Sequence, residues 1–268
     1  MRRSFAAAAA LLAFSAGLTA AAGAAPTPIL LELFTSEGCS SCPPADDLLQ
    51  RLERTQPARG ARLIVLSEHV DYWNALGWKD PFSSPQFTAR QSAYAARIDP
   101  SGGVFTPELV VDGREGVVGS DARAVSAAID REAAMPKLAM ALSRPSLQGS
   151  AIRVRVTAGA PQGPARLYVA IASDRVESNV TAGENAGRTL AHVSVVRALV
   201  TAGTFTGSAR IDKQLAIPMG AGAPSGGLRI VAFLQDVKSQ AILAAAQEAL
   251  PALSDTTLDN RRTARSMR

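Results

Sequence analysis

Two cysteines three positions apart constrain this chain more than any other feature, because they stand between a predicted strand and a predicted helix. Residues 29–34 form a short apolar run typical of a buried strand. The apolar residues after Cys42 recur at the spacing of one helix face: Ala45, Leu48, Leu49 and Leu52. This arrangement predicts Cys39 at the N-terminus of the helix, where unpaired amide groups and the helix dipole stabilise a thiolate.

The chemistry of Cys39 and Cys42 allows three interpretations. A structural disulfide between them would close a loop too small to restrict the unfolded chain much. A copper or zinc site needs ligands beyond two thiolates, and His69, at the end of the next predicted strand, is the candidate for a third. A redox-active dithiol fits the order strand, Cys-x-x-Cys, helix, with Cys39 as the attacking thiolate and Cys42 as the resolving thiol. We favour the redox interpretation on position, and we expect no resident cofactor or metal.

Composition excludes several classes of protein. The 268 residues include only two cysteines and two histidines, too few for a disulfide-rich scaffold or an iron–sulfur protein. The net charge is +5, but the basic residues are scattered along the chain, so we expect no nucleic-acid partner. The length suits two domains.

The first 25 residues read as a secretory signal peptide. Arg2 and Arg3 precede a short apolar run, and small residues follow it, with cleavage expected near Ala24 or Ala25. The apolar run is shorter than the ~20 residues of a membrane-spanning helix. We therefore expect a periplasmic or secreted protein that is soluble after signal cleavage, in an oxidising compartment.

Residues 26–136 alternate predicted strands and helices in the order β-α-β-α-β-β-α. After the strand and helix that flank the cysteines, we expect a buried strand over 62–70 and a helix over 84–97 with Ser84 as its N-cap. Asp112 and Gly113 mark a hairpin turn between strands over 104–111 and 116–118. A last helix is expected over 121–134, capped by Ser120.

The pattern changes after Pro136. Residues 137–250 hold several strand candidates separated by turns rich in Gly, Pro and Ser, which predicts an antiparallel β-sandwich. The strand candidates are residues 138–142, 152–156, 167–172, 192–199 and 228–234. A final helix is expected over 241–250, and residues 251–268 read as a flexible basic tail.

The element order, with Cys-x-x-Cys before the first helix, resembles the thioredoxin fold. That resemblance implies a cis-proline beside the dithiol, and Pro107 occupies the place, with Thr106 offering its backbone to a bound peptide. Without the resemblance, Pro107 reads equally well as a trans-proline of an edge strand. More closely, the chain resembles the exported bacterial family catalogued as domain of unknown function 1223. The matching stretches are Leu31–Asp46, His69–Trp73, Leu76–Phe82, Thr106–Pro107, Gly183–Asn185 and Gly187–Leu190.

Further site residues remain open between two roles. The resemblance implies a buried carboxylate that moves the proton of the resolving cysteine, and Glu32 is the candidate, although it could equally be a strand-end residue reaching solvent. His69, Asp71 and Trp73 could line a groove for a substrate peptide. Alternatively, Trp73 packs a long loop against the sheet, which we favour, and Asp71 caps a turn. A polar turn of Glu184, Asn185 and Arg188 is expected to face the first domain.

The expected fold is thus an α/β thioredoxin-like domain followed by an all-β antiparallel sandwich. The expected function is that of an exported thiol–disulfide oxidoreductase acting on protein thiols or a redox partner protein. The two residues between the cysteines, Ser40 and Ser41, do not indicate the direction of electron flow. The alternative is a metal-binding or structural interaction module on the same scaffold.

Overall fold

A computed structural model describes residues 25–207, 209–219 and 227–251. The expected signal peptide (1–25) lies outside the described residues except for Ala25, and the expected basic tail (251–268) lies outside them except for Pro251. Among the described residues, no helix is long and apolar enough to cross a membrane.

The first half has the predicted order β-α-β-α-β-β-α. Its elements are β1 (Thr27–Thr35), α1 (Pro43–Thr55), β2 (Ala61–His69), the short 3-10 helix η1 (Asn74–Leu76), α2 (Pro85–Ile98), β3 (Glu108–Val111), β4 (Glu115–Val118) and α3 (Ala122–Ala133). Ser84 caps α2 as predicted, because its side chain accepts from the Gln86 amide. The cap of α3 is Asp121 rather than Ser120, since the Asp121 carboxylate accepts the amides of Arg123 and Ala124.

The second half is built from strands alone in the described residues. They are β5 (Met140–Leu142), β6 (Ser146–Gln148), β7 (Ala151–Ala158), β8 (Ala165–Asn179), β9 (Thr189–Phe205), β10 (Ile211–Pro218), β11 (Leu228–Asp236) and β12 (Ile242–Leu250). The expected helix over 241–250 is wrong, because this segment is β12 and pairs with β11 along its length. Its alanines favour a helix locally, but burial of Ile242 and Ala244 against the neighbouring strands outweighs that preference.

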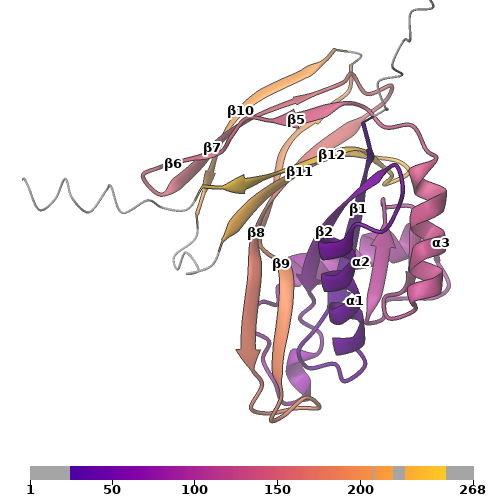
Figure 1. Ribbon diagram of the computed structural model, residues 1–268, viewed down its shortest axis with the longest axis vertical. Coiled ribbons are helices and arrows are strands. Elements are labelled where there is room, and N and C mark those ends of the chain that lie inside the picture. The colour runs from indigo at the N-terminus through magenta and orange to yellow at the C-terminus, as the bar shows by residue number, and fades with distance from the viewer. Residues whose placement is uncertain (1–24, 208, 220–226, 252–268) are drawn as a thin grey trace, which may run out of the picture.

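One eight-stranded sheet runs through both halves, in the order β12-β11-β8-β9-β2-β1-β3-β4 (Figure 1). Strands β1 and β2 are parallel, as predicted, and β1 pairs antiparallel with β3. The halves join where β2 meets β9 through the pair Ser67 and Val195. The described part of the molecule is therefore a mixed α/β protein that consists mostly of β-strands. Most of these strands belong to one large sheet, and few helices surround it.

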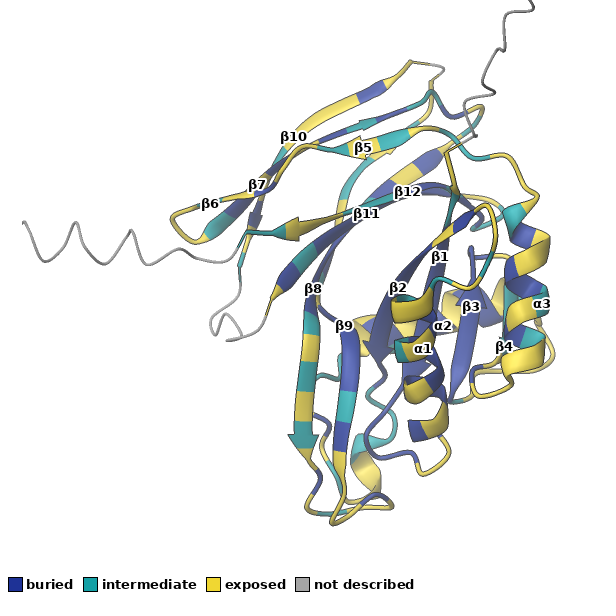
Figure 2. Cartoon of the chain, viewed as in Figure 1, coloured by how far each residue is buried: buried dark blue, intermediate teal, exposed yellow. Residues whose placement is uncertain are grey.

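A second, smaller sheet has the order β10-β7-β5, with β6 also paired to β7. It covers one end of the large sheet through an apolar cluster that joins β7 and β10 to β8 and β11. In Figure 2 the strands of the small sheet mix buried, intermediate and exposed residues, and β10 is mainly exposed. The core between these sheets lies away from the helices of the first half (Figure 1).

Strand β1 is buried on both faces, and its two faces meet different helices. Leu31 and Leu33 pack with α1 and α3, whereas Leu30 packs with Phe87 of α2 and Phe34 with Tyr94 of α2. Side chains alternate between the faces of a strand, so Glu32 lies on the α2 face. The face of β1 that each residue occupies decides which side chains can reach the cysteines.

Candidate functional site

The two cysteines form a disulfide at the junction of β1 and α1. Their Cα atoms lie 5.4 Å apart, and the Cys42 amide donates to the Cys39 carbonyl. The helix begins at Pro43, so Cys42 is its N-cap residue and Cys39 lies in the preceding turn. The sequence-based placement of Cys39 at the helix N-terminus is thus corrected by one turn: the N-terminal position belongs to Cys42, whose carbonyl accepts the amides of Ala45 and Asp46.

The Thr106–Pro107 bend lies next to this disulfide. The peptide bond between the two residues is cis, as the resemblance implied. The Ser41 hydroxyl lies 3.3 Å from the Cys39 sulfur and 3.5 Å from the Thr106 carbonyl oxygen, which it donates to. The indole Nε1 of Trp73 donates to the Thr106 hydroxyl over 2.8 Å. The structure therefore brings Cys39, Thr106 and Trp73 together, on segments that are distant in the sequence.

The turn between β8 and β9 covers the disulfide loop. The side-chain amide of Asn185 donates to the carbonyls of Glu37 and Cys39, both over 2.9 Å, and a Glu184 carboxylate oxygen accepts the Ser40 amide over 2.9 Å. The expected polar turn facing the first half is confirmed by these contacts. Both cysteines are fully buried in this closed arrangement, with 0% of their surface exposed.

A buried ionisable cluster that the sequence analysis missed lies beside the disulfide loop. The ring of His192, on β9, stands between Glu37 and Asp46, with one ring nitrogen 3.5 Å from each carboxylate. All three side chains are buried. Although burial opposes a charge on the ring, Asp46 and Glu37 raise the pKa of His192 from 6.5 to about 10. The imidazole is therefore an imidazolium at neutral pH, within a cluster of one positive and two negative groups.

The two carboxylates have further anchors. Trp78 donates its indole N–H to Glu37 over 2.8 Å, and the Thr35 hydroxyl donates to Asp46 over 3.3 Å. A signal for the carboxylates was available in the sequence, since Glu37 and Asp46 flank the Cys-x-x-Cys pair closely. Nothing in the sequence placed His192 with them, because it is brought there by the pairing of β9 with β2.

His69 is near the cluster but is committed to another carboxylate. Its Nδ1 lies 2.7 Å from Asp80, and its ring meets that of His192 edge to face with the centroids 4.7 Å apart. Burial works against ionisation of Asp80, but His69 and the amides of Glu37 and Phe82 lower the pKa of that carboxyl. Within the described part of the chain, no group of three or more His, Cys, Asp or Glu side chains is arranged to hold a metal ion.

Asp71 lies on the outer loop after β2 and is bonded to α2. Its carboxylate accepts the Thr88 hydroxyl over 2.5 Å, and its amide donates to the same hydroxyl. The structure therefore does not bring Asp71 to the disulfide with Trp73. Its contacts fasten the loop to α2.

Glu32 also lies apart from the dithiol, which corrects its expected role. It is fully buried on the α2 face of the sheet, where its carboxylate accepts from Arg90 over 2.6 Å and from the Tyr94 hydroxyl over 2.5 Å. Helix α1, which begins at Cys42, packs on the opposite face. A proton exchange between Glu32 and Cys42 would have to cross the sheet, so Glu32 cannot serve as the base.

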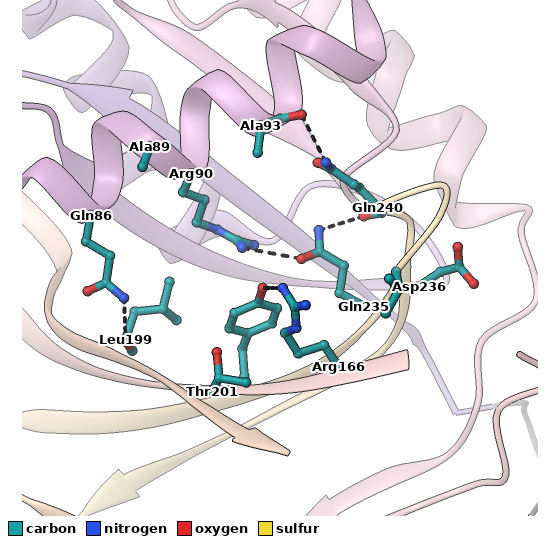
Figure 3. Close-up of a pocket in the computed structure, with 12 residues that line it drawn as sticks. Gln86, Ala89, Arg90, Ala93, Arg166, Leu199, Thr201, Gln235, Asp236 and Gln240 are labelled. Carbon is teal, nitrogen blue, oxygen red and sulfur yellow. Dashed lines mark hydrogen bonds between the residues drawn. The ribbon is translucent and has the colours of Figure 1, made fainter. Parts of the chain in front are cut away.

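The network around Glu32 reaches the wall of a cavity of about 320 Å³ between α2 and strands β8 and β9 (Figure 3). Arg90 extends from α2 toward Gln235 on β11 and donates to it over 3.3 Å, and Arg166 bonds the Tyr168 hydroxyl. Glu68 lies beneath Arg90 at 3.6 Å. Because it is buried and close to Glu32, the pKa of Glu68 is raised well above its usual value.

The family model with the description "Protein of unknown function (DUF1223)" matches residues 30–235 of this chain. The crystal structure of a protein from Agrobacterium tumefaciens is similar to the chain at 28% sequence identity, with a TM-score of 0.64, over 85% of this chain and 96% of that one. None of the curated proteins compared with the chain matches it. Since the family model spans well over half of the chain and includes both cysteines, the chain belongs to the DUF1223 family of proteins of unknown function.

Proposed function

We propose that this chain is an exported thiol–disulfide oxidoreductase whose first half is thioredoxin-like and whose second half packs as a β-sandwich on the shared sheet. Its substrates are protein thiols or disulfides, and its redox group is the Cys39–Cys42 pair. The observation that carries the proposal is the junction at Ser41, whose hydroxyl lies between the Cys39 sulfur and the Thr106 carbonyl. A disulfide next to a backbone bend supplies both a reactive bond and a place for a substrate chain.

The exchange reaction balances without any further cofactor. A thiolate of the partner attacks the Cys39 sulfur, the Cys39–Cys42 bond breaks, and its electron pair remains on Cys42, which takes up a proton. A second thiol of the partner then displaces Cys39. The partner's two thiols are oxidised to a disulfide, and two electrons and two protons pass to the cysteines of this chain. The reverse sequence, in which Cys39 attacks and Cys42 resolves, oxidises this chain.

The roles of the surrounding residues follow from their contacts. Thr106 and Pro107 flank the substrate chain, and Trp73 holds Thr106 through its indole N–H. Helix α1 supports a thiolate through its dipole alone, because Pro43 and Pro44 have no N–H and the amides of Ala45 and Asp46 donate to the Cys42 carbonyl. Since both sulfurs are buried, a partner reaches Cys39 only after the turn carrying Glu184 and Asn185 moves aside.

A defined trapping experiment tests the proposal. The mature Cys42→Ser protein, reduced and mixed with a peptide that contains one disulfide, should form a mixed disulfide on Cys39 that intact mass and peptide mapping identify. The matched control is Cys39→Ser, which should accumulate much less adduct because the proposal makes Cys39, not Cys42, the sulfur that exchanges with the partner. Wild-type protein poised in glutathione and dithiothreitol couples should pass reversibly between one disulfide and two thiols.

Complete burial of both cysteines favours a second candidate, a purely structural crosslink. It predicts that the disulfide resists every one of these couples in the folded state and that Cys39 forms no adduct. It also predicts that Cys39→Ala/Cys42→Ala only lowers the free energy of unfolding. That set of results would replace the redox proposal.

A further inference from the structure

We propose that His192 is a positioning residue for the dithiol. By neutralising one of the two buried carboxylates of Glu37 and Asp46, it makes a cysteine thiolate easier to form when the disulfide is reduced. This inference rests on the proposed function and deepens it. It assigns a role to a residue of the second half of the chain, which the redox motif itself does not contain.

The geometry begins with the two carboxylates. Glu37 lies two positions before Cys39, and Asp46 lies four positions after Cys42, one turn along α1. Residues four apart share a helix face, so Asp46 and Cys42 lie on the same side of α1. Both carboxylates are buried, and the loop between them contains both sulfurs.

The second observation is the ring of His192 between these acids. It contributes both of its nitrogens, Nε2 toward Glu37 and Nδ1 toward Asp46, at 3.5 Å each. In the described structure, neither nitrogen has a hydrogen-bond partner, and the facing carboxylate oxygens have none either. The ring is 1% exposed, so these unsatisfied groups have only each other for compensation.

The charged and titratable groups around the ring are compatible with one positive charge on His192. From β2, His69 presents the edge of its own ring, and its nearest acid is Asp80. The Phe82 ring meets His192 edge to face, and the Arg197 guanidinium lies over the Phe82 ring, 5.3 Å from its centroid. The groups that face His192 directly are thus Glu37 from the loop after β1, Asp46 from α1 and His69 from β2.

The charge balance has a consequence for reduction. With His192 protonated, the cluster has a net charge of −1. Without it, the two carboxylates carry a net charge of −2 that no cation in the cluster offsets. A new thiolate beside them then meets one more uncompensated negative charge. The thiolate becomes harder to form, and the reduced state is disfavoured wherever the thiol ionises.

The experiment compares redox equilibria at several pH values. Wild type and His192→Gln are equilibrated with the same dithiothreitol couple between pH 5 and pH 9, quenched in acid, unfolded, alkylated and counted by mass. The ratio of their equilibrium constants for reduction is expected near one at pH 5, where all thiols are protonated. It should rise to about tenfold in favour of the wild type at pH 9, which corresponds to about one unit of thiol pKa.

Two further variants separate charge from structure. The double variant His192→Gln/Asp46→Asn returns the cluster to a net charge of −1 and should recover most of the wild-type pH profile. Lys137→Met breaks a buried ion pair with Asp112 toward the start of β1, and it should change stability without changing the profile.

A ratio that stays constant from pH 5 to pH 9, whatever its value, overturns the role of His192 while leaving the redox proposal intact. If the double variant does not recover the wild-type pH profile, the charge argument is overturned in the same way. A wild-type disulfide that no couple reduces overturns the proposed function itself, and the inference with it.

Discussion

Replacing Arg90 by methionine should be among the most damaging single changes in the molecule. The guanidinium faces two fully buried carboxylates, with Nε 2.6 Å from Glu32 and 3.6 Å from Glu68, and it also donates to Gln235 and to the Tyr94 hydroxyl. Methionine preserves the apolar contacts with the surrounding rings but removes the charge. Both acids then lose the cation beside them, and Glu32 keeps the hydrogen bond from the Tyr94 hydroxyl.

The magnitude follows from the burial of the two acids. Glu32 and Glu68 are each 0% exposed, so removing their cation costs about 3–5 kcal/mol of unfolding free energy, as for other broken buried pairs. Proteins of ordinary stability unfold at about 5–15 kcal/mol, so the loss is a large fraction of the total. With a urea dependence of about 3 kcal/mol/M, the midpoint of unfolding should fall by roughly 1–2 M.

The pH dependence gives the sign of the effect. Burial and the neighbouring Glu32 already raise the pKa of Glu68 well above its ordinary value of 4.5, and loss of Arg90, which lowers that pKa, raises it further. The contribution of Glu68 to stability is complete below pH 4.5 and is lost as the pH rises through its folded-state pKa. The deficit of Arg90→Met against wild type should therefore be largest at pH 7 to 8 and shrink toward pH 4.

Urea unfolding followed by circular dichroism at several pH values measures this deficit. The double variant Arg90→Met/Glu32→Gln is the matched control, because it removes one charge of each sign and should regain part of the loss. The dithiol equilibrium should be unchanged in both variants, since α2 and α1 lie on opposite faces of β1. A midpoint for Arg90→Met within 0.3 M of wild type at pH 7, estimated against that ~1–2 M shift, would refute the reasoning.

Three other predictions concern the cover of the dithiol and two buried titrating groups. Asn185→Ala removes two hydrogen bonds to the disulfide loop, so dithiothreitol should reduce the disulfide about tenfold faster. The control Asn179→Ala loses only a bond to Thr189 on the same hairpin and should leave the rate of reduction unchanged. Equal rates in the two variants would contradict the covering role of Asn185. Burial raises the pKa of Asp112 from 3.8 to about 6 despite the opposing effect of Lys137. The contribution of Asp112 to the unfolding free energy is therefore complete below pH 3.8 and should fall by about 3 kcal/mol as the pH rises to 6. The urea midpoints of wild type and Asp112→Asn should diverge between these pH values, and parallel curves would contradict the prediction. The pKa of His192 is raised to about 10, so its contribution to the unfolding free energy should be complete below pH 6.5 and fall by up to roughly 5 kcal/mol by pH 10. Urea titrations should find this decline in wild type and not in His192→Gln.

Much of the first half follows from local patterns. The order of its strands and helices, the Ser84 cap and the hairpin at Asp112 depend on side-chain spacing and backbone preferences within a few residues, and these the sequence contains directly. The position of Cys39 and Cys42 between β1 and α1 follows from the same patterns. The error of one turn at Cys39 arose because two prolines begin the helix after Cys42, and proline favours the first helical turn.

Other features depend on contacts between distant segments. The alanine-rich stretch 242–250 is a strand because β11 pairs with it and the core buries Ile242, Ala244 and Ala245. The sequence left Glu32 open between a buried acid and a strand-end residue reaching solvent, and only the packing of α2 on its face of β1 gives it Arg90 as a partner. These outcomes depend on the packing energy between segments that are distant in the sequence, and a local sequence pattern does not contain that energy.

The sequence by itself determined the Cys-x-x-Cys pair and its place between a strand and a helix, because both are set by residues close together in the chain. The cis bond before Pro107 was implied only by the resemblance to a known fold. Only the tertiary structure decided which groups surround the sulfurs. It placed Asn185 over the loop and His192 between Glu37 and Asp46, because the joining of β9 to β2 brings together side chains more than a hundred positions apart. It placed Glu32 on the other face of the sheet, because α2 packs on that face of β1.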